Sequence, residues 1–317
     1  MIEAMLDNKP SLLVVDDQPL NIQALYEIFN DTYQVRMATT GLQALAACEE
    51  QLPDLILLDV LMPDMGGHEV CQRLKLNERT RDLPVIFVTA QSDPEDEAYG
   101  FELGAVDFIT KPFNATVVRA RVHTHLKLRA ALRLVQQLAY HDTLTQLPNR
   151  RLLIDRVEQA MATGKRNGHY GALMFLDLDS FKSLNDVHGH AAGDRLLEEV
   201  AKRLQHAVRE SDTVARLGGD EFVVLLSHLA TEAEESSTHA TIAAEKIRAA
   251  LAMPYFLKVE SGDHSCEIEH RCSASIGVVL FQGQHETLGN LFKWADGAMY
   301  QAKQAGKNQI RFYAPTE

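Results

Sequence analysis

The sequence is poor in cysteine and in positive charge. Only four cysteines occur among 317 residues, too few and too scattered for a disulfide framework. Acidic residues outnumber basic ones by 44 to 31, which gives a formal net charge of -13. Such a balance disfavours general nucleic-acid binding, because neutralising phosphates needs clustered Lys and Arg. There is no signal-like N-terminal pattern and no apolar run of the ~20 residues a membrane span needs. We therefore expect a cytoplasmic protein that binds neither membrane nor nucleic acid.

The first part of the chain alternates short apolar runs with helical patterns. The runs SLLVV, DLILL and PVIFV are uninterrupted, as expected for parallel strands that are buried on both faces. Repeated alternation of strand and helix predicts an α/β domain with a doubly wound parallel sheet. We place this domain at residues 10–130.

Residues 115–139 contain no Gly or Pro and read as one long helix. Leu128, Ala131, Val135 and Leu138 follow 3-4 spacing, which is typical of a short coiled-coil seam. The other interpretation is a terminal helix that packs on its own sheet. We expect both: the first half packs on the sheet, and the second half leaves it as a stalk that favours a homodimer.

A second domain is predicted at residues 139–313. Apolar strands are expected at GALMFLDL, FVVLLS and SASIGVVLF, and helices near 190–208, 231–252 and 288–305. Two of the strands flank a tight Gly-Gly turn, which predicts an antiparallel hairpin. The domain is therefore expected to be α+β rather than wholly parallel.

Polar residues follow the strands of the first domain. They are Asp16, Asp17, Asp59, Thr89 and Lys111. Because ligands of open α/β sheets bind beyond the carboxyl ends of the strands, we expect these side chains to converge. Three carboxylates suit Mg²⁺, and a carboxylate beside the metal can accept a phosphoryl group. Thr and Lys would then hold the added oxygens.

The pairs and segments Asp16–Asp17, LDVLMPDMGG, VTA and DFITKPF resemble the receiver domain of two-component response regulators. The resemblance implies Asp59 as the phosphoacceptor, one Mg²⁺ on Asp16, Asp17 and Asp59, and a sensor histidine kinase as phosphodonor. It also implies Thr89 and Phe108 as a switch pair, together with Lys111. His68 stands where such domains commonly have an apolar residue, and we interpret it as a surface substitution.

A second acidic group surrounds the segment ARLGGDEFVVLL. A hairpin turn explains Gly218 and Gly219, but not the adjacent acids Asp220 and Glu221, which repel each other. Asp177 ends another apolar strand. If that strand lies beside the hairpin, three acids meet at a turn without side chains, where a nucleotide phosphate chain and Mg²⁺ can approach.

Four further residues suit a guanine nucleotide. Lys303 and Lys307 are spaced i, i+4 near a helix end and would face one way if the helix persists. Asp194 can accept from the adjacent N–H donors of guanine, and Asn185 can complete the recognition. The alternative for Asn185 and Asp194 is helix capping.

The segments DTLTQLPNR, DLDSFKSLND, GHAAGD, RLGGDEF, SIGV and AKQAGKN resemble the GGDEF family of diguanylate cyclases, a nucleotidyl-cyclase-like fold. The resemblance implies synthesis of cyclic di-GMP and two pyrophosphates from two GTP molecules across a dimer. It implies two Mg²⁺ ions held by Asp177, Asp220 and the Leu178 carbonyl. Glu221 would lie near the reacting 3′-hydroxyl as ligand or base. The implied substrate-binding residues are Asn185, Asp194, Lys182, Lys303 and Lys307. Two departures from the family pattern are Gln146 for a glycine and Lys307 for an arginine.

The segment RESD resembles the family's inhibitory site for cyclic di-GMP. It contains Arg209 and Asp212, and Lys246 stands where a second arginine is usual. The alternative is a solvated helix end with a local ion pair. Together the patterns predict a phosphorylation-controlled cyclase with product inhibition. The alternative from another class is a catalytically silent sensor of GTP or cyclic di-GMP.

Overall fold

The computed structural model describes residues 9–90, 94–261, 264–283 and 286–314. The chain divides into two compact units, Met1–Val135 and Gln136–Glu317. The helix α5 (Ala115–Tyr140) runs across the boundary between them. Among the described helices, none combines the length and the apolar composition that a membrane span requires.

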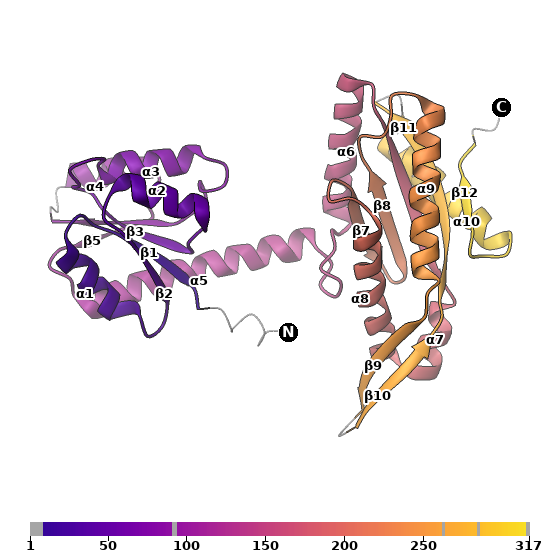
Figure 1. The fold of residues 1–317 in the computed structure, drawn as a ribbon, viewed down its shortest axis with the longest axis horizontal. Helices are drawn as coiled ribbons and strands as arrows, with labels where there is room; N and C mark the ends of the chain where they lie inside the picture. Colours follow the sequence, from indigo (N-terminus) through magenta and orange to yellow (C-terminus); the bar gives the residue numbers. More distant parts are fainter. Residues whose placement is uncertain (1–8, 91–93, 262–263, 284–285, 315–317) are drawn as a thin grey trace. The chain divides into compact units, whose positions relative to one another are not determined.

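The first unit is a five-stranded parallel sheet with helices on both faces (Figure 1). The strand order is β2-β1-β3-β4-β5. Before α5, its elements are β1 (Ser11–Val15), α1 (Pro19–Phe29), β2 (Gln34–Ala38), α2 (Gly41–Glu50), β3 (Leu55–Asp59), α3 (Gly67–Leu76), β4 (Val85–Thr89), α4 (Pro94–Glu102) and β5 (Asp107–Thr110).

The core of this unit lies in two layers. Every residue of β1, β3 and β4 is buried, because side chains that alternate across a central parallel strand meet helices on either face. One apolar cluster joins the sheet to α2 and α3, and the other joins it to α1 and α5. The predicted doubly wound α/β class is confirmed.

The second unit is α+β. Its main sheet has the order β12-β11-β6-β8-β7, and β9 and β10 form a separate two-stranded sheet. Its elements are α6 (Arg150–Asn167), β6 (Tyr170–Asp179), α7 (Phe181–His188), α8 (His190–Ala207), β7 (Thr213–Gly218), β8 (Glu221–Leu226), α9 (Ala233–Leu251), β9 (Tyr255–Ser261), β10 (His264–His270), β11 (Ser273–Gln282), α10 (Leu288–Gln304) and β12 (Ile310–Phe312).

The main sheet of this unit is antiparallel except at its β11–β12 edge. One face packs on α8 and α9, and the other packs on α6 and α10. Long central strands buried on both faces explain the unbroken apolar runs of β6 and β11. The predicted α+β class is confirmed, and the sequence analysis had not located helix α6.

Helix α5 changes character along its length. Val118, Val122 and Leu126 are buried against the sheet of the first unit. Beyond them Leu128, Val135 and Leu138 are each more than half exposed. A helix whose apolar side chains stand in water normally has a partner for that face.

Candidate functional site

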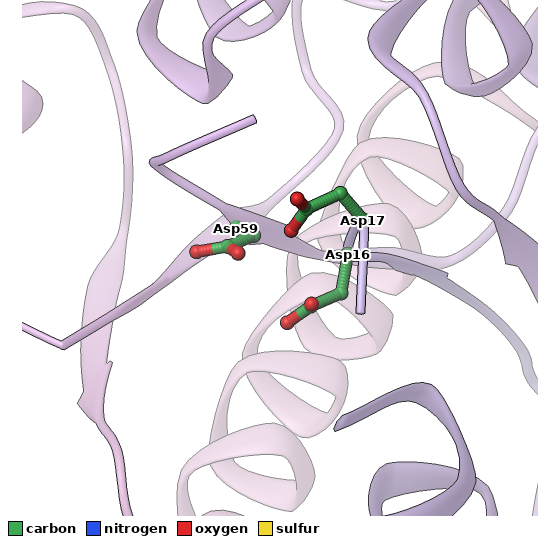
Figure 2. Close-up of side chains that lie close together, drawn as sticks. All are labelled: Asp16, Asp17 and Asp59. Atoms are coloured by element: carbon green, nitrogen blue, oxygen red, sulfur yellow. The ribbon is translucent and has the colours of Figure 1, made fainter. Parts of the chain in front are cut away.

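Three aspartates gather at the carboxyl end of the sheet of the first unit (Figure 2). Asp16 follows β1, Asp17 is next to it, and Asp59 is the last residue of β3. Each offers one carboxylate oxygen within 4.8 Å of the others. The parallel strands end at one edge of the sheet, and this brings together residues more than 40 positions apart.

Lys111 completes this cluster from the end of β5. Its Nζ lies 2.7 Å from Asp16 Oδ2 and 2.9 Å from Asp59 Oδ2. Burial opposes the charge of Lys111, but the hydrogen bonds to the two carboxylates outweigh it and raise its pKa. Burial, together with the charge of Asp16, raises the pKa of Asp59 despite the lysine. The negative charge of Asp59 is therefore less stabilised than the charge of a solvent-exposed aspartate, although Lys111 lies beside it.

The donor set fits one hard divalent cation. Asp17 Oδ1 is buried and has no hydrogen-bond partner among the described residues. A buried acceptor without a donor is costly, and a cation removes the cost. Three carboxylates in one place are the oxygen ligands that Mg²⁺ takes.

The two expected switch residues lie on neighbouring strands. Thr89 ends β4 and Phe108 lies in β5, and both are buried. The backbone N–H of Lys111 donates to the Thr89 carbonyl at 2.8 Å, so Thr89 and the lysine are held at the same edge. The Phe108 ring packs against Phe87 and Phe101 with centroid distances of 5.5 and 4.9 Å.

His68 is not a surface substitution, as the sequence had indicated. Its ring packs edge-on against Phe87 at 5.0 Å and against Tyr99 of α4 at 5.2 Å. Its Nε2 is buried without a partner in the described part of the chain. Burial lowers its pKa, which keeps the ring neutral and apolar in character. Sequence alone missed this because helix α4 covers the position only in the folded domain.

The second acidic group forms across two antiparallel strands. Asp177 of β6 lies directly opposite Glu221, the first residue of β8. The turn from β7 to β8 contains Gly218 and Gly219, whose φ values are 145° and 53°. A Cβ on either glycine would meet nothing within 4 Å. The glycines therefore serve the backbone conformation, and the turn stands open for a ligand.

Asp177 is the buried member of this group, with 9% of its surface exposed. Burial and the negative charges of Asp220 and Asp179 raise its pKa, while Lys303 lowers it. The Lys303 Nζ lies 2.7 Å from Asp177 Oδ2. Asp220 is half-buried and Glu221 is exposed. A cation near Asp177 and Asp220 would offset the repulsion between the two carboxylates, so these residues fit a divalent metal.

Arg216 holds the glycine turn in place. Its guanidinium donates twice to the Gly219 carbonyl, at 3.0 and 2.7 Å, and once to Asp142 Oδ1 at 2.9 Å. Asp142 also accepts from the backbone and the hydroxyl of Thr145. Sequence analysis singled out the segment with Asp142 and Thr145 without assigning it a role. The partner of Asp142 is Arg216, 74 residues further along the chain, and only the folded structure shows this contact.

The expected guanine-binding residues lie on successive helices. Asn185 is on α7 and the exposed Asp194 is on α8. A Cβ on Gly193 would lie 2.0 Å from Asn185 Oδ1, so the glycine lets α8 approach this side chain. Asn185 Oδ1 is buried and has no partner among the residues described. An amide in that state has unused capacity for a ligand donor.

Of the remaining predicted residues at this site, Leu178 and Lys182 differ in setting. The Leu178 side chain is buried in the core, so only its backbone can serve a ligand. Lys182 is exposed on α7.

The expected geometry of the two downstream lysines is wrong. Helix α10 ends at Gln304, so Lys303 and Lys307 do not share one helical face. Lys307 lies beyond the helix with a φ of 62°, and its side chain is exposed. The helix ends early because the chain turns to begin β12, with the Lys307 N–H donating to the Ala302 carbonyl at 3.1 Å.

The three residues of the expected inhibitory site line one cavity of about 330 Å³. Helix α8 ends at Ala207, so Arg209 and Asp212 lie in the following turn and not one helical turn apart. The Arg209 N–H donates to Asp212 Oδ2 at 3.1 Å. Lys246 reaches the same cavity from α9.

Comparison with known families agrees with these two sites. Residues 12–123 match the response regulator receiver domain, and residues 139–309 match the diguanylate cyclase GGDEF domain. The chain belongs to the GGDEF family. Its GGDEF domain carries the open glycine turn, and its receiver domain carries the aspartate cluster.

Individual relatives share one or both domains. The response regulator PleD of Caulobacter vibrioides is 32% identical over 267 residues, which is 81% of this chain and 56% of PleD. The bifunctional diguanylate cyclase/cyclic di-GMP phosphodiesterase MucR of Pseudomonas aeruginosa is 46% identical over 186 residues, 59% of this chain and 25% of MucR. The chain thus spans between a quarter and just over half of these two curated relatives.

Among solved structures, the coiled coil and GGDEF domain of DgcB from Caulobacter crescentus, in complex with c-di-GMP, is similar. The TM-score is 0.52 and the identity is 28%, covering 62% of this chain and 97% of that one.

Proposed function

We propose that this protein is a phosphorylation-controlled diguanylate cyclase that condenses two GTP molecules into cyclic di-GMP and two pyrophosphates. The observation that carries the proposal is the meeting of Asp177, Asp220 and Glu221 at an open glycine turn beside Lys303. Acids at a bare turn with a lysine in reach are what nucleotide phosphate chemistry with Mg²⁺ needs.

Different residues of the GGDEF domain recognise the base, bind the phosphates, hold the metal ions and accept the proton. Asp194 and Asn185 recognise guanine, and Lys182, Lys303 and Lys307 bind the phosphates. Asp177, Asp220 and the Leu178 carbonyl would hold two Mg²⁺ ions, which, when bound, neutralise charge on the phosphate oxygens. Glu221 orients the 3′-hydroxyl and accepts its proton.

One GGDEF domain is half of a catalytic site. Each domain binds one GTP, and the 3′-hydroxyl of each attacks the α-phosphate of the other. Two P–O bonds form, and two pyrophosphates leave. Bringing the two half-sites face to face raises the rate, because it makes a bimolecular encounter intramolecular.

The receiver domain controls this encounter. Asp59 accepts a phosphoryl group from a sensor histidine kinase, and Thr89 and Lys111 hold the added oxygens. Phe108 moves with Thr89, and a dimer forms through the receiver and the exposed seam of α5. The apolar side chains of that seam support a second copy as partner.

Product inhibition acts through the cavity lined by Arg209, Asp212 and Lys246. Arg209 offers a planar fork to guanine and phosphate, and Asp212 accepts from guanine. Lys246 supplies charge without bidentate geometry, so binding is weaker than with two arginines. The complex of the similar DgcB domain with c-di-GMP supports a cyclic dinucleotide as ligand.

The proposal is tested by incubating the purified full-length protein with GTP and Mg²⁺ and identifying the products. We expect cyclic di-GMP and pyrophosphate in a ratio of one to two. Binding of GTP or cyclic di-GMP without turnover would instead support the sensor alternative. A mononucleotide cyclase would release cyclic GMP.

A further inference from the structure

Asp179 is a buried carboxylate that the proposed reaction does not use. It is the last residue of β6 and is 6% exposed. Its Oδ1 accepts from the Ser275 hydroxyl at 2.8 Å. Its Oδ2 accepts from the Ser273 hydroxyl at 2.6 Å and from the Asn308 backbone N–H at 3.1 Å. Three donors of the chain itself thus hold both oxygens of Asp179.

The Asn308 bond fixes an unusual turn. Lys307 and Asn308 both have positive φ, 62° and 47°, a conformation that is unfavourable for a lysine and tolerated by an asparagine. Asn308 is held from a second side, because its Oδ1 accepts from Arg248 of α9 at 3.0 Å. Such a conformation persists when surrounding bonds over-determine it. Asp179 supplies one of those bonds.

The turn belongs to the proposed phosphate site. Lys307 directly precedes the residue that Asp179 holds, and Lys303 at the end of α10 lies against Asp177. Asp179 therefore ties the segment bearing Lys307 to the strand that bears Asp177.

We infer that Asp179 is a positioning residue that holds Lys307 for the triphosphate of GTP. The inference rests on the proposed cyclase function. It assigns Asp179 an effect on nucleotide affinity rather than on the chemical step, because its hydrogen bonds go to Ser273, Ser275 and the backbone of the turn.

The test compares variants of the full-length protein by KM for GTP, by kcat and by calorimetric binding of a non-reactive GTP analogue. Asp179→Ala should raise both KM and the analogue's dissociation constant about fivefold to tenfold, with kcat within about twofold. Asp179→Asn should restore most of the affinity, because its amide oxygen can still accept from Asn308 while its N–H donates to Ser275. Ser275→Ala removes a bond to the other oxygen and should leave KM unchanged.

A double substitution separates positioning from general destabilisation. In a Lys307→Ala background, Asp179→Ala should raise KM no further, because the lysine it positions is gone. If Lys307→Ala alone leaves analogue binding unchanged, the phosphate role within the proposed function is wrong. If Lys307→Ala weakens binding, three results for Asp179→Ala would overturn the positioning role. These are an effect on KM that adds to that of Lys307→Ala in the double variant, an effect on kcat alone, or no effect.

If Asp179→Ala does not fold, amide hydrogen exchange on the wild type still tests the bond between the Asn308 N–H and Asp179. The Asn308 amide should be protected although it lies outside any helix or strand. Rapid exchange at Asn308 would also overturn the inference.

Discussion

The two acidic sites of this chain use the same parts in different ways. Each has an aspartate at or near the end of a buried strand, Asp59 or Asp177, with a lysine Nζ at 2.9 or 2.7 Å. In each, burial raises the pKa of the aspartate. The receiver acids lie within 4.8 Å of one another and surround a cation site from one domain. In the GGDEF domain Asp220 and Glu221 instead stand on an open turn.

This difference indicates what each site needs from outside the chain. The receiver cluster has its carboxylates, lysine and threonine at one sheet edge, so a cation and a phosphodonor suffice. The turn of the GGDEF domain leaves its acids accessible from solvent, as a half-site must if a second nucleotide is to reach it. The receiver cluster is therefore contained in one copy, whereas the proposed cyclase reaction needs two.

The largest effect should come from the open turn. Asp220→Ala removes a metal-binding carboxylate, and cyclic di-GMP synthesis should fall by at least about a hundredfold. The thermal unfolding midpoint should stay near that of the wild type, because the side chain is only half-buried. Asp155→Ala, which removes an exposed acid on α6, is the control. Substantial turnover by Asp220→Ala would remove the metal assignment.

Asp59→Asn tests the link between the two sites. In the wild type, beryllofluoride should raise both the dimer fraction, measured by light scattering, and the specific activity. The variant should show neither response, because the amide cannot take the phosphoryl analogue. A variant that still responds would show that the analogue acts elsewhere.

The inhibitory cavity should give a moderate effect. Arg209→Ala should weaken inhibition by added cyclic di-GMP about tenfold without lowering the initial rate, since it removes a charge-assisted contact to the product. Lys246→Arg should strengthen inhibition. If the wild type is not inhibited at product concentrations well above micromolar, Arg209 and Asp212 do not form a product site, and the alternative of a solvated helix end with a local ion pair is favoured.

Metal binding to the receiver should depend on pH. The Asp59 carboxylate must be ionised to bind Mg²⁺, and its raised pKa means that protons compete sooner as the pH falls. Mg²⁺ affinity should therefore begin to fall at a higher pH than for an exposed aspartate, which stays ionised to about pH 4. Calorimetric titration across pH measures this, and Asp59→Asn should flatten the profile.

The smallest effect concerns stability without metal. A raised carboxyl pKa favours folding below the group's ordinary pKa, and that contribution is lost as the pH rises through the raised value. At neutral pH, the raised pKa of Asp177 therefore disfavours folding, and Asp177→Asn in chelator should raise the thermal unfolding midpoint of the GGDEF domain. Lys303→Ala should destabilise it, because it leaves Asp177 without its cation. Thermal unfolding in chelator measures both effects. A lower midpoint for Asp177→Asn than for the wild type would show that the ionised Asp177 carboxylate does not disfavour folding.

Sequence patterns predicted the fold class of both units because buried strands leave long apolar runs. Pairing of the acids was also predictable, since strand ends in a parallel sheet must converge and the Gly-Gly turn marks a hairpin. Other features depended on long-range contacts. The burial of His68 comes from α4, and the clamp on the turn joins Arg216 to Asp142. The end of α10 before Lys307 has a local signal in Gly306, whose φ is 114°, but the bond from the Asn308 N–H to Asp179 joins residues 129 positions apart.

The account's central claim is that the cyclase site requires encounter between two copies. The most direct test measures the initial rate of cyclic di-GMP formation against total protein concentration, with and without beryllofluoride. Specific activity should rise with concentration and then level off, and the analogue should move that rise to lower concentrations. A rate strictly proportional to protein concentration throughout, and indifferent to the analogue, would contradict it.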